Sequence, residues 1–215
     1  EAALELYQRR AGVAAANGLA ALLLSRLFDF AAVTGGLALA CFAMAAAGTH
    51  PELEWLVPTG VFLLVPAAVC AWASLNGERL VALAGRILGV FGLARTALGR
   101  RILEFSSRAG AALGAVPRRS LAFAAACTLP IWLFVFAFYG VLARGFGMED
   151  LAFPVAVFGS GLAIVATLLP LHGFAGFGVQ DAGWVAGFVA LGVEPELATS
   201  SGLAAHVVYL VNIAV

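Results

Sequence analysis

The amino-acid sequence predicts an all-α membrane protein, a polytopic helical bundle with broken or re-entrant helices and an inverted repeat. Three observations carry this prediction. Of the 215 residues, 63% are hydrophobic and only 11% are charged, and the mean hydropathy is +1.02, well outside the composition of soluble domains. Apolar stretches long enough to cross a bilayer alternate with short polar turns. In addition, residues 167–184 place proline, glycines and a carboxylate within apolar sequence.

We expect residues 1–215 to form a single transmembrane domain that is part of a longer protein. The sequence begins in the polar end of a helix, residues 1–10, and stops at Val215 inside an apolar run. It contains no metal-ligand cluster, nucleophile elbow or nucleotide loop. We therefore expect no metal, no cofactor and no nucleic-acid partner, and we assign no catalytic residue.

Two spans are expected in the first third of the chain. Residues 13–47 are almost continuously apolar, which is longer than the roughly 20 residues that a span needs. This helix is therefore tilted, broken near Gly35-Gly36, or extended into the cytoplasmic interface. Residues 55–75 predict a second span, because Trp55 and Trp72 lie near its two ends, where tryptophan anchors helices at the membrane interface.

Residues 76–119 differ from the rest of the chain. They carry eight arginines against two glutamates, interleaved with leucine, valine and phenylalanine at helical spacing. This pattern predicts one or two amphipathic helices on the membrane surface, and the positive-inside rule places them in the cytoplasm. Two roles stay open: a topology signal with general attraction to anionic headgroups, or the gathering of an anionic lipid substrate.

The second half of the chain predicts one further span and a set of shorter elements. Residues 120–143 are apolar apart from isolated polar groups and contain Pro130. The chain re-enters the membrane at Leu151 and descends to Pro170. Residues 179–191 are short for a span and are expected to form half of a broken element. Pro195 suits the first turn of the last helix, which contains His206.

Residues 167–184 are the best candidate for a functional site. Glycine lowers helix stability by roughly 1 kcal/mol and proline by roughly 3, so the backbone is expected to unwind or turn back here. Irregular backbone at membrane depth is tolerated only where protein buries it or where it lines a wet cavity. The polar and special residues of this stretch are Pro170, His172, Gly173, Gly176, Gly178, Gln180 and Asp181.

An offset of 180 residues aligns several features of the chain with one another. Glu1-Ala2 falls on Asp181-Ala182, and Arg26, inside the first long helix, falls on His206. This match predicts a repeat. The turn at Gly12-Val13 likewise falls on the turn at Gly192-Val193. Since alternation of spans places these two turns on opposite sides of the membrane, the repeat is expected to be inverted.

Charged groups inside the apolar helices have structural and functional interpretations. Arg26 and Asp29 are three residues apart and lie on one helix face; they form either a structural ion pair or a cavity wall that binds a phosphate or zwitterionic headgroup. Asp181 could pair with Arg26, bind a cationic headgroup, carry a proton, or cap a helix. His172 and His206 could pack and hydrogen-bond, or relay protons.

The run LLPLHGFAGFGVQDAGW, the following GV-x-PE-x-A and a histidine in the next helix resemble the flippase-like integral membrane family, which includes the transmembrane domain of bacterial lysylphosphatidylglycerol synthases. Residues 25–29 are similar to the Glu-Arg-x-x-Asp of that family. Ser25 replaces the glutamate of this motif, and Asp181 stands where glutamate is usual. The resemblance covers most of the chain and begins partway through the family domain.

These residues and the resemblance together predict a multi-pass flippase of the bacterial inner membrane. It would move an anionic or aminoacylated phospholipid, or a polyprenyl-phosphate-linked lipid, between leaflets through a polar intramembrane cavity. Arg26 would hold the phosphate, and Asp181 and His172 the headgroup. The candidate substrate-binding residues are Arg26, Asp29, His172, Gly173, Gly176, Gly178, Gln180, Asp181 and His206.

Two alternatives from other classes remain at this point. One is an intramembrane enzyme that acts on lipid-phosphate headgroups, with Asp181 and His172 as acid and base. The other is a non-catalytic membrane partner of a soluble lipid synthase. The expected protein partners are such a synthase domain or a second copy of the chain.

Overall fold

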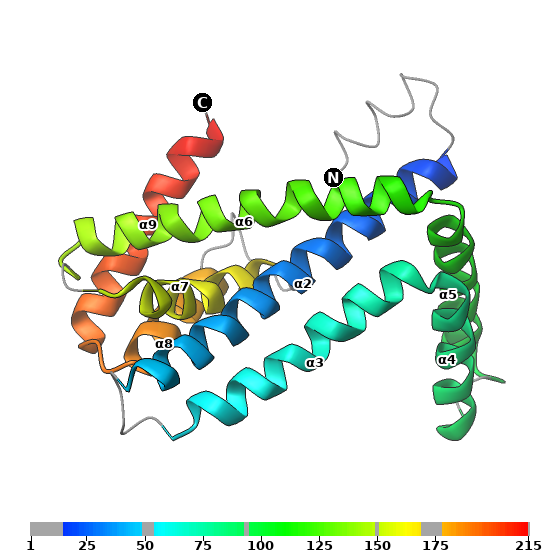
Figure 1. Cartoon of the computed structure of the whole chain (residues 1–215), viewed down its shortest axis with the longest axis horizontal. Coiled ribbons are helices and arrows are strands. Elements are labelled where there is room, and N and C mark those ends of the chain that lie inside the picture. Colours follow the sequence, from blue (N-terminus) through cyan, green and yellow to red (C-terminus); the bar gives the residue numbers. More distant parts are fainter. Residues whose placement is uncertain (1–14, 49–53, 93–94, 149–150, 169–177, 215) are drawn as a thin grey trace. The chain divides into compact units, whose positions relative to one another are not determined.

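The computed structural model describes residues 15–48, 54–92, 95–148, 151–168 and 178–214, and all regular structure in these ranges is helical. Figure 1 shows the helices. Their bounds are α2 (Ala15–Ala47), α3 (Leu56–Leu75), α4 (Gly77–Val90), α5 (Ala97–Gly114), α6 (Arg118–Gly145), α7 (Phe153–Leu168), α8 (Val179–Val189) and α9 (Pro195–Ala214). The predicted all-α class is confirmed.

Three of these helices are long and apolar enough to cross a membrane. They are Leu24–Ala47 within α2, Leu56–Leu75 and Arg118–Gly145. The spans expected at residues 55–75 and 120–143 therefore correspond to α3 and α6. Each contains a proline, Pro66 and Pro130 respectively, and membrane helices tolerate such interruptions because neighbouring groups compensate the lost hydrogen bonds.

The first long helix is not broken at its glycine pair. α2 continues through Gly35 and Gly36 as one helix of 33 residues, so the break considered for this position is wrong. The reason lies in packing: a Cβ atom on Gly36 would lie 2.8 Å from Cε2 of Phe136 on α6. The glycine provides space for an aromatic ring, and close approach through small residues is a common way for membrane helices to associate.

Contacts divide the chain into two compact units. Unit 1 comprises residues 1–29 and 68–128, and unit 2 comprises residues 30–67 and 129–215. The expected single transmembrane domain stays a prediction.

Within unit 1, the two amphipathic helices expected from the arginine-rich segment are α4 and α5. Thr96 separates them, because its hydroxyl oxygen accepts the Gly99 N–H at 3.0 Å and so begins α5.

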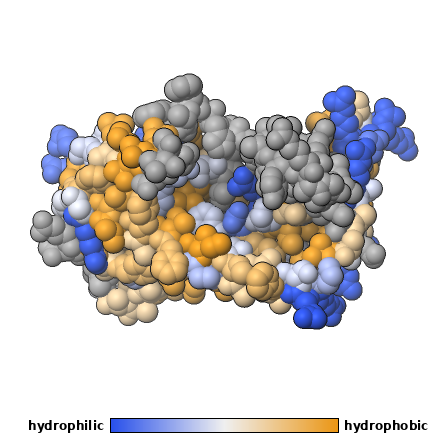
Figure 2. Space-filling model, turned by 90° about the horizontal axis from the view of Figure 1, so that it is seen from above, coloured by the Kyte–Doolittle hydropathy of each residue, from blue (hydrophilic) through white to orange (hydrophobic). Residues whose placement is uncertain are grey.

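α4 and α5 pack through a pair of glycines. A Cβ atom on Gly77 would lie 2.6 Å from the carbonyl oxygen of Gly110, and one on Gly110 would lie 2.7 Å from that of Gly77. The two backbones are therefore in direct contact at this point. Figure 2 shows hydrophilic residues gathered in the region of these helices, at the right of the view. Arginines exposed on the described part of this segment include Arg79, Arg86, Arg95, Arg100, Arg101 and Arg108.

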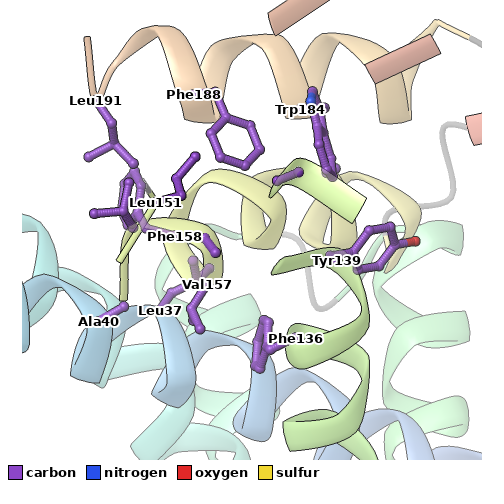
Figure 3. Close-up of a cluster of buried hydrophobic side chains, with 14 of the residues drawn as sticks. Leu37, Ala40, Phe136, Tyr139, Leu151, Val157, Phe158, Trp184, Phe188 and Leu191 are labelled. Atoms are coloured by element: carbon purple, nitrogen blue, oxygen red, sulfur yellow. The ribbon is translucent and has the colours of Figure 1, made fainter. Parts of the chain in front are cut away.

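The core of unit 2 is a cluster of aliphatic and aromatic side chains (Figure 3). Tyr139 of α6 lies 5.9 Å from Trp184 of α8, measured between ring centroids, and Trp184 lies 4.7 Å from Phe188. Phe188 is fully buried. Tilted aromatic pairs at these separations contribute about 0.5–1.5 kcal/mol beyond the area that they bury, so these rings fix α8 against α6.

α7 and α8 pack closely against each other within unit 2. A Cβ atom on Gly187 would lie against the backbone of Gly159, only 2.9 Å from its carbonyl carbon, and one on Gly183 would lie 2.7 Å from the carbonyl oxygen of Leu162. With 16 and 11 residues, each helix is shorter than the roughly 20 residues of a span. The re-entrant arrangement and the inverted repeat stay predictions, and residues 1–14 lie outside the described ranges.

Gly187 provides a test of the α7–α8 contact. We expect Gly187→Ala to lower the unfolding temperature in detergent, because overpacking costs about 1–3 kcal/mol and exceeds the roughly 1 kcal/mol that alanine gains in a helix. Gly145→Ala is the matched control, since a Cβ atom there meets nothing within 4 Å. An unfolding temperature for Gly187→Ala equal to that of Gly145→Ala would contradict the close packing.

Candidate functional site

The candidate site begins at the N-terminus of α8. Gly178, the residue before the helix, has φ 91° and ψ −56°, a conformation that side chains with a Cβ atom rarely adopt. Asp181 is the third residue of α8, and its Oδ2 atom accepts the Gly178 N–H at 3.0 Å. A carboxylate in the first turn also suits the positive end of the helix dipole. The glycine and the acid together define where α8 starts.

The second oxygen of Asp181 contacts α9. Its Oδ1 atom lies 2.8 Å from Nδ1 of His206. The side chain of His206 is 1% exposed and that of Asp181 is 15% exposed. An ionised carboxylate only accepts hydrogen bonds, so Nδ1–H of the imidazole is then the donor. In the neutral ring, this arrangement leaves Nε2 as an acceptor.

A second hydrogen bond between α8 and α9 holds this pair in place. The indole N–H of Trp184 donates to the hydroxyl oxygen of Ser201 at 3.1 Å, and both residues are buried. Along α8 the contacts run from Asp181 to Trp184, whereas along α9 they run from His206 back to Ser201. The two helices are therefore antiparallel. A Cβ atom on Gly202 would lie 2.9 Å from Cδ1 of Trp184, so the helices are closely packed here.

The structure brings together four of the residues that the sequence singled out. Gly178, Gln180 and Asp181 open α8, and His206 reaches Asp181 from α9. Gln180, which precedes Asp181 in α8, is buried at 6% exposure. The ring of Tyr209 stands edge-on to that of His206, with centroids 6.4 Å apart. The site is thus a carboxylate–imidazole pair with a phenol ring beside the imidazole.

Of the other candidate residues, two belong to unit 1 and three lie outside the described residues. Arg26 and Asp29 lie on α2 within unit 1, where Arg26 is exposed and Asp29 is half-buried. Their pairing with each other or with Asp181 stays a prediction. His172, Gly173 and Gly176 lie outside the described residues.

Two features of the site differ from the sequence analysis. Asp181 is not the N-cap residue, because Gly178 occupies that position and Asp181 caps from the third position of the helix. Trp184 and Ser201 were not identified as site residues. A tryptophan three residues after Asp181 was an available signal, since this spacing places it on the face of its polar neighbour. The spacing of Ser201 and His206 gave no such signal.

The comparison with protein families addresses the whole chain. The profile described as the lysylphosphatidylglycerol synthase TM region matches residues 1–215. The chain belongs to this family. It is accordingly a multi-pass membrane protein associated with lipid synthesis or flipping. A search of curated proteins and a search of solved structures each found no match. Membership in the lysylphosphatidylglycerol synthase TM family confirms the resemblance drawn from residues 25–29 and 168–206.

The Asp181–His206 contact in this family member is expected to couple the two residues energetically. Asp181→Ala and His206→Ala should each destabilise the protein, and the double variant should be less unstable than the sum by about 1 kcal/mol or more, because contacting residues are not additive. Reversible unfolding in mixed micelles measures this coupling. The control cycle pairs Asp181→Ala with Ser200→Ala, since the Ser200 hydroxyl bonds only within its own helix. Additivity in both cycles would contradict the contact.

Proposed function

We propose that this chain translocates a phospholipid or a polyprenyl-phosphate-linked lipid across the bacterial inner membrane. The single observation that supports this most is the Asp181–His206 pair, a carboxylate and an imidazole 2.8 Å apart in an otherwise apolar helical segment. Ionisable groups inside membrane helices are costly and commonly mark the path of a substrate, an ion or a proton. The family supports a lipid as the substrate.

The chemistry of the pair favours the polar headgroup as its ligand. Each carboxylate oxygen of Asp181 already accepts one hydrogen bond, from Gly178 and His206, and each has a further lone pair. The side chain stays 15% exposed. A partly accessible acid of this kind can accept hydrogen bonds from an ammonium or hydroxyl group of a headgroup. An aminoacylated phospholipid carries such an ammonium group, which makes it a suitable substrate.

The remaining parts of the mechanism follow from the candidate residues. Arg26 would bind the lipid phosphate, because a guanidinium matches phosphate in charge and geometry. The glycines at positions 173, 176 and 178 would let backbone N–H groups approach the headgroup. The acyl or polyprenyl tails would stay in the bilayer while the headgroup moves through the polar cavity.

Lipid scrambling in proteoliposomes tests this proposal. A fluorescent phosphatidylglycerol, reduced from outside, reports how fast lipids exchange between leaflets. We expect Asp181→Ala and His206→Ala to slow this exchange at least about tenfold, equivalent to about 1.4 kcal/mol in the barrier. Asp181→Glu should retain more activity than Asp181→Ala, because it keeps the carboxylate.

Glu196→Ala is the matched control for this experiment. Glu196 is an exposed acid in the first turn of α9, so its loss removes one negative charge without touching the pair. An unchanged exchange rate in folded Asp181→Ala and His206→Ala protein would refute the proposed role of the site. An exchange rate lowered equally in all variants, the control included, would mean that the effect does not come from the Asp181–His206 pair.

The same preparation distinguishes the enzymatic alternative. A hydrogen-bonded Asp–His pair is also an arrangement that enzymes use to move protons, and this observation keeps a lipid-headgroup enzyme as the second candidate. Such an enzyme would form a new product from labelled lipid with the purified protein alone. Scrambling without any new product would support the transporter.

A further inference from the structure

Unit 1 contains a cavity that the proposed transport site does not include. It has a volume of about 300 Å³, at the small end of the roughly 300–1,000 Å³ typical of ligand sites. Four helix ends surround it: the ends of α3 and α5 and the beginnings of α4 and α6. The lining residues are Ser74, Leu75, Asn76, Gly77, Arg79, Leu113, Gly114, Val116, Arg118 and Leu121.

Two arginines contribute positive charge to the cavity. Among the residues whose side chains the structure describes, the lining includes Arg79 and Arg118 and no acidic residue. Both side chains are exposed, so their guanidinium groups are accessible. An Arg guanidinium binds phosphate through two parallel hydrogen bonds, and two of them around one space suit an anionic oxygen group.

Backbone groups at the same place add to this potential. α4 begins at Gly77 and α6 at Arg118, both in the cavity lining, and the Asn76 side chain makes no capping hydrogen bond to α4. The first N–H groups of a helix have no partner within the helix, and they point toward an anion placed before its first turn. Two helix beginnings and two arginines therefore act on the same space.

The position along the chain places the cavity at the membrane surface. α3 and α6 are long and apolar enough to span a membrane; α3 ends at Leu75 and α6 begins at Arg118, and the arginine-rich segment connects these two ends. Both ends therefore lie at the membrane face that carries the arginines. Phosphate groups of lipids lie at this level. The apolar lining residues Val116 and Leu121 suit the glycerol region below the phosphate.

From the cavity, its two arginines and its position at the membrane surface, we propose that unit 1 binds the phosphate group of an anionic lipid headgroup at the arginine-bearing membrane face. The cavity holds a headgroup phosphate and is too small for the acyl chains, which extend into the bilayer. This site is separate from the Asp181–His206 pair and does not depend on the transport proposal. Its failure leaves lipid scrambling as a separate question.

Lipid titration with native mass spectrometry tests this site in the intact chain. Phosphatidylglycerol is the probe, phosphatidylcholine is the zwitterionic comparison, and inorganic phosphate is the soluble anion. The wild-type protein should bind phosphatidylglycerol more tightly than phosphatidylcholine. In the double variant Arg79→Gln, Arg118→Gln, this affinity should fall at least about tenfold, because charge-assisted hydrogen bonds are lost.

The control removes the same number of charges as the variant, but from positions outside the cavity. Arg86→Gln with Arg100→Gln also removes two exposed arginines from α4 and α5, but neither lines the cavity. We expect this control to bind phosphatidylglycerol nearly as well as wild type. Equal losses in both double variants would overturn the proposal in favour of general surface attraction, and so would no loss in either.

A substitution that fills the cavity separates its shape from its charge. Gly114 lines the cavity, and a Cβ atom there meets nothing within 4 Å, so Gly114→Leu should fold and retain both arginines. We expect it to weaken phosphatidylglycerol binding, whereas Gly89→Leu on α4, a position equally open to a Cβ atom, should not. Full binding by Gly114→Leu would overturn the cavity assignment. If inorganic phosphate displaced the lipid at equal concentration, this would overturn the proposal that the bound phosphate group belongs to a lipid.

Discussion

The hydrogen bond between Asp181 and His206 is the interaction on which the candidate site depends. It joins the first turn of α8 to the middle of α9, 25 residues apart in sequence. Without a partner, each group would be a buried or half-buried polar atom in an apolar bundle, which costs about 1–3 kcal/mol or more. With the partner, the carboxylate and the ring hold one another in a fixed orientation.

That orientation depends in turn on how closely the surrounding helices pack. Gly187 allows α8 to lie on α7, and Gly202 makes space for the indole of Trp184 against α9. The indole then bonds to Ser201 and stacks toward Tyr139 and Phe188. Membrane helices gain little from the hydrophobic effect when they associate, so small residues and interhelical hydrogen bonds carry the association. The site is therefore a product of packing as much as of its charged groups.

Much of the fold was predictable because its signals are local. Hydrophobic stretches of sufficient length identified α3 and α6, and Pro195 marked the first turn of α9. The glycine pair in α2 was misleading, because a glycine can also serve to make space for a neighbouring side chain. Gly36 makes space for the ring of Phe136, a hundred residues away in the sequence. Sequence distance hides that kind of compensation.

The sequence predicted which residues belong to the site, but not which of them contact one another. Gly178, Gln180, Asp181 and His206 were singled out by their polarity within apolar sequence, but the partner of Asp181 was open, with Arg26 suggested by the internal repeat. The antiparallel packing of α8 on α9 places His206 against Asp181, and the Trp184–Ser201 hydrogen bond and Gly202 support that packing. Tertiary contacts of this kind leave no periodic signal along the chain.

The two polar regions of the chain differ in the half of a lipid headgroup that each can recognise. The pair in unit 2 offers a carboxylate and an imidazole, which suit donors such as an ammonium or a hydroxyl group. The cavity in unit 1 offers two guanidinium groups and helix N–H donors, which suit the oxygens of a phosphate. A zwitterionic or aminoacylated headgroup contains both kinds of group. The two regions therefore differ in selectivity, because phosphate contacts suit every phospholipid whereas an acid favours lipids that carry a donor group.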